Sequence, residues 1–235
     1  MDHHLLTVQN AKTQKGEPLG YLTGILYLVP SDESKLGNLC PYASTGCRHA
    51  CLYTAGRGRM EKVKNGRLRK TKLFFEDSAR FADALVHEIA TLTLKAYRRG
   101  MMPAIRLNGT SDIPWERIKA SNEYPLMAMF PHVQFYDYTK RPDRKPLFPN
   151  YHLTFSRSEC NDEQVMKELA NGRNVAIVFD TKRGLPLPPR WNSWPVLDGD
   201  THDLRFLDAP YHVVGLRAKG DAKSDTSGFV VIGGS

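Results

Sequence analysis

The stretch SARFADALVHEIATLTLKAYRRGMMPAIRLNGTSD, from Ser78 to Asp112, contains a helix followed by a strand. Apolar residues at helical spacing predict an amphipathic helix over Ser78–Arg99, with Ser78 as its N-cap and Gly100 as its stop. The run Ala104–Leu107 is bounded by turn residues and predicts a strand. The residues directly after this strand are polar where a core would be apolar: Asn108, Gly109, Thr110, Ser111 and Asp112.

Similar strand patterns recur on both sides of this unit. The six expected strands are Ile25–Val29, Ala104–Leu107, Val133–Tyr138, Tyr151–Phe155, Val175–Phe179 and His212–Leu216. Shorter helices are predicted at Pro114–Ala120, capped by Asp112, and at Asn161–Ala170. Alternating strands and helices favour parallel strands, so we expect an α/β fold: an incomplete (β/α) barrel of about six mostly parallel strands in one domain, residues 1–235. Chemistry in such folds sits at the carboxyl ends of the strands.

The composition is that of an ordinary globular protein. Hydrophobic residues make up 41% of the chain and charged residues 25%, which excludes a disordered or fibrous protein. No apolar run approaches the roughly 20 residues that cross a bilayer. The beginning of the chain also lacks a basic segment followed by an apolar one. We therefore expect a cytoplasmic protein with no membrane partner.

Basic residues exceed acidic residues, 33 against 25, and the excess is concentrated in RGRMEKVKNGRLRKTK, Arg57–Lys72. Such a run favours phosphate-bearing partners, so a nucleic acid or nucleotide is the expected ligand. A solvated helix face is the alternative interpretation. The candidate contacts to nucleic acid are Arg57, Arg59, Arg67, Arg69, Lys70 and Lys72.

Three of the four cysteines lie close together, in Cys40-Pro-Tyr-Ala-Ser-Thr-Gly-Cys47-Arg-His-Ala-Cys51. In a reducing cytoplasm this clustering indicates metal ligation rather than disulfides. If Cys47 and Cys51 occupy one helical turn, both sulfurs lie on one face, and a bend at Gly46 brings Cys40 toward them. The segment therefore predicts one metal centre.

The number of thiolates bears on the choice of metal. Three thiolates leave one position open on a [4Fe-4S] cluster, whereas a structural zinc site needs four Cys or His ligands. His49 or Cys160 could complete such a closed site, so zinc stays an alternative, as do core cysteines without a metal. We expect an iron–sulfur cluster held by Cys40, Cys47 and Cys51.

Several of these motifs resemble the gene product 88 family of phage-encoded proteins. The resemblance covers most of the chain, in the segments Gln9–Thr13, Cys40–Arg59, Arg106–Asp112, Phe135–Arg141, Leu197–Asp208 and Val214–Gly220. It implies a phage protein in the cytoplasm of an infected host cell. It assigns no reaction.

In layout the chain is similar to the radical S-adenosylmethionine superfamily, with a cysteine loop after the first strand and a partial barrel. That resemblance implies an enzyme whose cluster binds S-adenosylmethionine and takes an electron from a donor. By position, Asn108–Asp112 would contact the methionine ammonium, and Ser156 and Arg157 the ribose or carboxylate. The cysteine spacing here, six residues and then three, differs from the three and two usual in that superfamily.

Two functions remain open at this point. The leading expectation is a radical-SAM-like enzyme that acts on a nucleic acid or nucleotide. The alternative is a non-catalytic nucleic-acid-binding module, in which a zinc or iron–sulfur site only holds the cysteine loop. Gly109–Asp112 also fits a simple turn with an N-cap, and Ser156 fits a helix cap.

Overall fold

The structure is a computed structural model that describes residues 4–8, 10–120 and 123–233, so Gln9 of the first motif lies outside the described residues. The chain divides into two compact units, which we describe separately. The first unit contains the chain up to Cys40, Glu61–Asp137 and Lys145–Leu153. The second contains Pro41–Met60, Tyr138–Arg144 and the chain from Thr154 onward.

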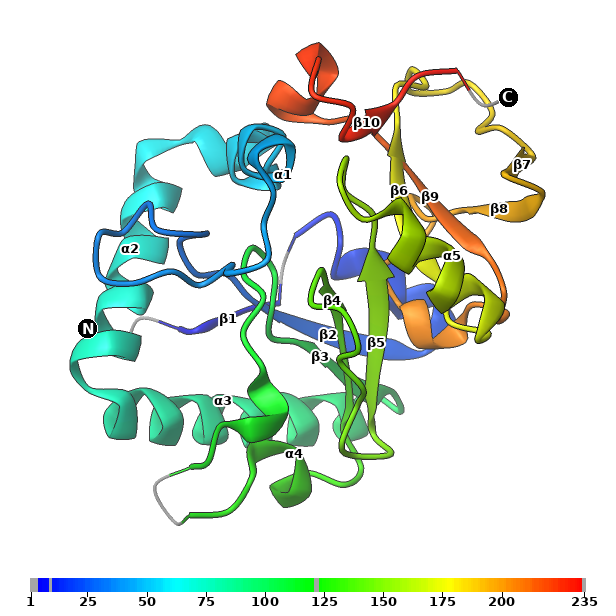
Figure 1. The fold of residues 1–235 in the computed structure, drawn as a ribbon. Coiled ribbons are helices and arrows are strands. Elements are labelled where there is room, and N and C mark those ends of the chain that lie inside the picture. Colours follow the sequence, from blue (N-terminus) through cyan, green and yellow to red (C-terminus); the bar gives the residue numbers. More distant parts are fainter. Residues whose placement is uncertain (1–3, 9, 121–122, 234–235) are drawn as a thin grey trace. The chain divides into compact units, whose positions relative to one another are not determined.

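The strands of the first unit form a mostly parallel sheet (Figure 1). They are β1 (Leu6–Thr7), β2 (Tyr21–Leu26), β3 (Met102–Arg106), β4 (Gln134–Thr139) and β5 (Tyr151–Ser156), of which β4 and β5 end in the second unit. β1 is antiparallel to β2, β2 is parallel to β3, and β3 is parallel to β4. The residues after β2 and β3 therefore leave the same edge of the sheet.

Three helices belong to the first unit: α2 (Glu61–Glu76), α3 (Ser78–Arg98) and α4 (Leu126–Met129). The long helix α3 forms as its apolar spacing predicts, and Phe81, Leu85 and Ile89 are all buried. Its N-cap is Asp77, one residue before the expected Ser78; the Asp77 carboxylate accepts a 3.1 Å hydrogen bond from the Arg80 amide. Aspartate competes with serine at this position because both side chains accept from the first turn.

The helix α3 packs closely on β2. A Cβ atom at Gly24 would lie only 2.7 Å from Cδ1 of Leu92, so any larger residue here would force the Leu92 side chain to shift. The apolar face of α3 and the inner side chains of β2, β3 and β4 form one core cluster, which also contains Trp115. This unit therefore has a hydrophobic core of its own.

The second unit contains the remaining five strands and two helices. They are α1 (Thr45–His49), α5 (Asp162–Ala170), β6 (Val175–Phe179), β7 (Arg190–Trp191), β8 (Trp194–Asp198), β9 (Val213–Arg217) and β10 (Val230–Val231). β6 is parallel to the end of β5, to β9 and to β10. β8 is parallel to β9, and the short β7 is antiparallel to β8.

This unit has two apolar clusters. One joins the buried faces of β6 and β9 to Val165 and Leu169 of α5. The other is small and consists of Ala50, Ala222, Phe229 and Val230, with Cys47 packed against it. The packing of Cys47 and Ala50 in this cluster thus holds the cysteine segment in the second unit.

The expected α/β class with mostly parallel strands is confirmed, but the barrel of six strands is not. All six expected strands exist, as β2, β3, β4, β5, β6 and β9; β6 has the expected ends, and the other five have at least one shifted end. In the described residues the sheet has ten strands in the open order β1-β2-β3-β4-β5-β6-β9-β8-β7, with β10 beside β6. Three of the additional strands, β1, β7 and β10, have only two residues each, too few to show a strand pattern in the sequence. The fourth, β8, has five residues and was missed. The cysteine loop follows β2, the first of the expected strands.

One expected helix is replaced by a turn. Asn161–Ala170 is confirmed as α5, but Pro114–Ala120 contains only a 3₁₀ turn at Trp115–Arg117. Asp112 does not cap it: the residue before the turn is Pro114, and no side chain caps it. The Ala120 amide, which a helix would bond to Glu116 O, donates instead to Tyr124 O at 2.9 Å. Backbone groups that a helix would need are bound elsewhere.

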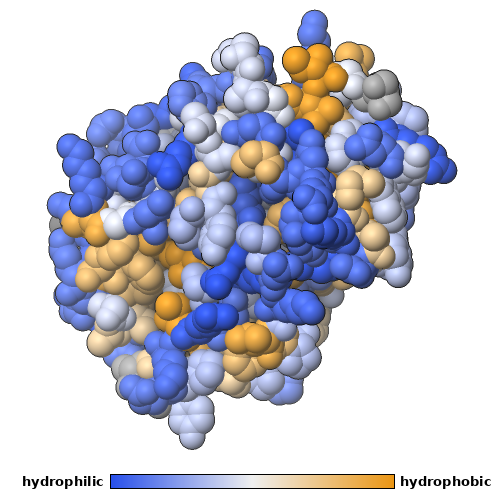
Figure 2. Space-filling view, viewed as in Figure 1, coloured by the Kyte–Doolittle hydropathy of each residue, from blue (hydrophilic) through white to orange (hydrophobic). Residues whose placement is uncertain are grey.

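The surface shown in Figure 2 is mainly hydrophilic, with small and separate apolar areas. Within the described residues, no helix is both long enough and apolar enough to span a bilayer.

Candidate metal centre and strand-end turns

Cys40 ends the first part of the first unit and lies beside the turn that follows β3. Its amide donates a 2.8 Å hydrogen bond to Oδ1 of Asn38, and its Sγ is 3.7 Å from the carbonyl oxygen of Thr110. The next backbone contact, from the Asp112 amide to Leu39 O, measures 2.8 Å. The carboxyl end of β3 therefore holds Cys40 at the edge of the sheet.

Asn108 organises this turn and is 2% exposed. Its Oδ1 accepts hydrogen bonds from Ser111 Oγ, the Ile113 amide and Trp115 Nε1, at 2.8, 2.9 and 3.1 Å. Its Nδ2 donates to Ile113 O at 2.9 Å. A buried side chain with this many partners is structural, because losing any of them would leave a polar group unsatisfied.

Gly109 and Thr110 tie the same turn to the chain after β2. The Gly109 amide donates to Leu26 O at 3.0 Å, and an added Cβ would lie 2.6 Å from that oxygen. Thr110 Oγ1 donates to Leu28 O at 2.5 Å. Asn108, Thr110 and Ser111, expected at a methionine ammonium, thus hydrogen-bond within the protein. These contacts agree with the alternative interpretation, in which Gly109–Asp112 is a simple turn.

Cys47 lies in α1, and Cys51 follows two residues after its end. Ser44 is the N-cap, and its Oγ accepts a 3.1 Å hydrogen bond from the Cys47 amide. The helix ends at His49, and Cys51 has an extended backbone with φ −60° and ψ 135°. The condition that both cysteines occupy one helical turn is therefore not met. Ala50, the C-cap of this short helix, packs into the small apolar cluster.

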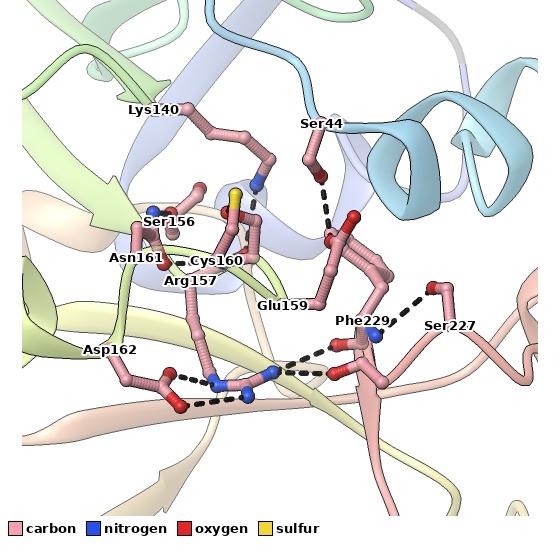
Figure 3. A network of polar contacts seen from close by, with 12 residues as sticks. Ser44, Lys140, Ser156, Arg157, Glu159, Cys160, Asn161, Asp162, Ser227 and Phe229 are labelled. Atoms are coloured by element: carbon pink, nitrogen blue, oxygen red, sulfur yellow. Dashed lines mark hydrogen bonds and ion pairs between the residues drawn. The ribbon is translucent and has the colours of Figure 1, made fainter.

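The carboxylate of Glu159 fixes the start of α1 (Figure 3). Its Oε2 accepts from Ser44 Oγ at 2.7 Å, and its Oε1 accepts from the Gly46 amide at 2.8 Å. Burial opposes ionisation, but hydrogen bonds from Ser44 and from backbone amides, with the charge of Lys140, bring the pKa of Glu159 below its usual value. Glu159 was missed in the sequence analysis. An acidic residue in the loop between an expected strand and an expected helix was the available signal.

Arg157 lies in the same loop, directly after β5, and serves as a bridge. Its Nε and Nη2 donate to the carboxylate of Asp162 at 2.7 and 3.2 Å. Its Nη1 donates to Gly228 O and Phe229 O at 2.9 and 3.3 Å, as Figure 3 shows. Ser156, the last residue of β5, accepts a 3.1 Å hydrogen bond on its carbonyl from Asn161. All three guanidinium nitrogens expected at a ribose or carboxylate are engaged within the protein.

One protein family matches nearly the full length of the chain. Residues 4–232 match the family described as Gene product 88, which leaves only a few residues at either end outside the match. The chain belongs to the gene product 88 family. This supports the phage-type assignment made from the motifs. Searches of curated proteins and of solved structures found no match to the chain.

The basic run of this gene product 88 protein separates into residues with internal contacts and residues that face solvent. Arg67 lies over the ring of Tyr27 at 5.1 Å, Lys70 donates to Leu5 O at 2.6 Å, and Arg59 contacts Thr54 O and Asp221. The exposed basic residues of the run are Arg57, Arg59, Lys62, Arg69 and Lys72, of which Arg59 also makes the contacts just given. Lys62 was not among the candidates for nucleic-acid contact, although it lies on α2 with Arg69 and Lys72.

The donor chemistry of the cysteine segment suits a thiolate-ligated metal. In the described residues none of the four cysteines forms a disulfide; Cys40, Cys47 and Cys51 are of intermediate exposure, and Cys160 is exposed. Cys40 belongs to the first unit, and Cys47 and Cys51 belong to the second. Across residues 4–8, 10–120 and 123–233, no three or more Cys, His, Asp or Glu side chains are gathered as a ready metal site. A metal that binds these cysteines would therefore have to bring its ligands together as it binds.

Proposed function

We propose that Cys40, Cys47 and Cys51 ligate an iron–sulfur cluster, in the simplest case [4Fe-4S]. The observation that carries the proposal is that the three clustered cysteines lie outside disulfides in the described residues and are partly exposed. Unliganded core cysteines are among the most buried of all residues, and these three are not buried. Three thiolates would leave one position of the cluster without a protein ligand.

The surroundings of two of the cysteines support this proposal. Cys40 is held by the turn after β3, through Thr110 O and the Asp112–Leu39 backbone contact. Cys47 is held through Ser44. Groups that orient the ligands of a metal contribute to its affinity even though they do not touch it.

The proposal includes an enzymatic function similar to that of the radical S-adenosylmethionine superfamily, with an electron donor as partner in the host cytoplasm. When bound and reduced, a cluster held by Cys40, Cys47 and Cys51 would supply an electron. The side chains of Asn108, Thr110 and Ser111 do not fit the role of ammonium contacts, because they already hydrogen-bond within the protein. The proposed enzymatic function therefore does not depend on these three side chains binding S-adenosylmethionine.

Anaerobic purification followed by iron, sulfide and zinc analysis tests the proposal. We expect a brown protein with absorption at about 400 nm and about four irons per chain. Adding S-adenosylmethionine to the reduced protein and recording the electron paramagnetic resonance spectrum then tests the open position. A colourless protein that contains one zinc and no iron after reconstitution would contradict the iron–sulfur proposal.

The second candidate is a nucleic-acid-binding module with a structural metal. It is favoured by the solvent-facing cations of α2, Lys62, Arg69 and Lys72. In this case the metal only folds the cysteine loop, and the cluster or zinc has no open position. Binding of nucleic acid with full affinity by a protein that has a zinc-filled site, and no response to S-adenosylmethionine, would favour this candidate.

A further inference from the structure

Two segments of the second unit that are far apart in sequence meet at Glu159. One is the loop between β5 and α5, which contains Glu159, and the other is the start of α1. The Glu159 carboxylate accepts the Ser44 hydroxyl at 2.7 Å and the Gly46 amide at 2.8 Å. Figure 3 shows the carboxylate pointing toward Ser44. Both carboxylate oxygens of Glu159 therefore accept hydrogen bonds from residues within three positions before Cys47.

The contact at Gly46 leaves no space for a side chain. A Cβ atom there would lie 2.2 Å from Ser227 Oγ and 2.8 Å from Oε2 of Glu159. Ser227 is in turn held by Asp225, which accepts its hydroxyl at 2.7 Å, and by the Phe229 amide at 3.2 Å. The start of α1 is thus enclosed between Glu159 and Ser227.

The loop that presents Glu159 is itself well fixed. Asn161 accepts the Ser158 amide at 2.7 Å and donates to Ser156 O at 3.1 Å. Lys140 donates to Arg157 O at 3.0 Å, and the Arg157 side chain binds Asp162 and the carbonyls before β10. Because these hydrogen bonds hold the loop in place, the Glu159 carboxylate can in turn fix the position of the start of α1.

We infer that Glu159 is a positioning residue, which sets the place of the Cys47 thiolate through the hydrogen-bond series Glu159–Ser44–Cys47. The inference rests on the proposed function, in that the thiolate placed here is a proposed metal ligand. The α1 helix has only five residues, and a helix of that length has no stability of its own. Its geometry therefore depends on external contacts. The Glu159 hydrogen bonds are charge-assisted, the stronger kind.

The test uses Glu159→Ala and Glu159→Gln in the full chain, with Glu163→Ala as matched control. Glu163 lies on α5, is exposed, and pairs only with Lys167 among the described residues. We expect Glu159→Ala to speed hydrogen exchange of the Gly46 and Cys47 amides, and alkylation of Cys47, at least about tenfold. After anaerobic reconstitution its iron content should fall below half that of the parent protein. Glu159→Gln should be intermediate because it keeps one acceptor, and Glu163→Ala should match the parent.

Failure of this inference and failure of the proposed function give different results. If the parent protein takes up no iron, the proposed function fails, and the exchange and alkylation rates still decide the role of Glu159. If Glu159→Ala shows parent exchange rates, parent iron content and the parent resonance spectrum, the inference is overturned and the function stands. Should Glu159→Ala fail to fold, Ser44→Ala interrupts the same series at its next member and is held to the same outcomes.

Discussion

The hydroxyl of Tyr151 donates a 2.9 Å hydrogen bond to Oδ2 of Asp137, which is 1% exposed. The other carboxylate oxygen accepts the Asn108 amide at 2.6 Å. Asp137 thus joins Asn108, two residues after the end of β3, to the first residue of β5. A buried carboxylate is tolerated here because its oxygens are hydrogen-bonded.

Removing the Tyr151 hydroxyl should destabilise the folded protein. We expect Tyr151→Phe to lower the free energy of unfolding by about 1.5–3 kcal/mol, the range for a hydrogen bond to a charged group. Urea unfolding followed by circular dichroism measures this loss. Tyr97→Phe is the matched control, since Tyr97 is 48% exposed. An equal loss in both variants would contradict a special role for the Tyr151–Asp137 contact.

Lys70 predicts a specific dependence of stability on pH. Burial lowers the pKa of Lys70 from 10.5 to about 8, although the charge of Glu88 opposes this. Between these two pH values the unfolded chain binds more protons at this lysine than the folded protein does. The free energy of unfolding should therefore rise with pH in that interval, by up to about 1.4 kcal/mol per pH unit.

Unfolding experiments on Lys70→Met should show that this contribution to the rise is absent. Lys72→Met is the control for the loss of a lysine, because Lys72 is on the same helix and exposed. If Lys70→Met and the parent protein have parallel stability curves between pH 8 and 10.5, the assignment to Lys70 is wrong.

Replacing each cysteine by alanine in turn distinguishes the cysteines that bind the metal from those that do not. Replacing Cys40, Cys47 or Cys51 by Ala should each abolish cluster loading, measured as iron content and absorption at about 400 nm. Cys160→Ala should load normally, because the proposal gives this exposed thiol no bond to the metal. Loss of the cluster in Cys160→Ala would instead mean that four cysteines close the site.

The solvent-facing cations of α2 predict salt-dependent binding of nucleic acid. Lys62, Arg69 and Lys72 are separated by seven and three residues and so share one face, over roughly 15 Å of helix. Changing all three to Gln should reduce the log–log salt slope by about 0.9 per lost contact with duplex DNA. The double variant Lys95→Gln/Arg98→Gln on α3 is the control. If the triple variant has the parent slope, or the parent protein does not bind, α2 has only a solvated face.

The parts of the fold that followed from sequence are those with strong local periodicity. Val175–Phe179 was predicted with its exact ends, because a short apolar run bounded by polar residues leaves little ambiguity. The ends of α3 were within one residue for the same reason. The two-residue strands β1, β7 and β10 have no such pattern, since two residues show no period.

Much of the candidate site could not be predicted because it depends on distant partners. Lys70 and Arg69 are neighbours in one basic run, yet only Lys70 meets a carbonyl, that of Leu5, because the helix turns it inward. The sequence also showed Glu159 beside Cys160 but not that its carboxylate meets Ser44, which lies 115 residues earlier. Residue type indicated the chemistry, while tertiary contacts decided which residues were available for it.

The hydrogen bonds of Asn108 also bear on how the protein ages chemically. Asparagine followed by glycine ordinarily loses its amide when the glycine nitrogen attacks the side-chain carbonyl carbon. At Asn108 the amide group has four hydrogen bonds and the Gly109 nitrogen is bound to Leu26 O, so the attacking geometry is out of reach. Asn171-Gly172, at the exposed end of α5, has no comparable restraint on its side chain in the described residues. During long storage we therefore expect isoaspartate, detected by peptide mass spectrometry, at Asn171 well before Asn108.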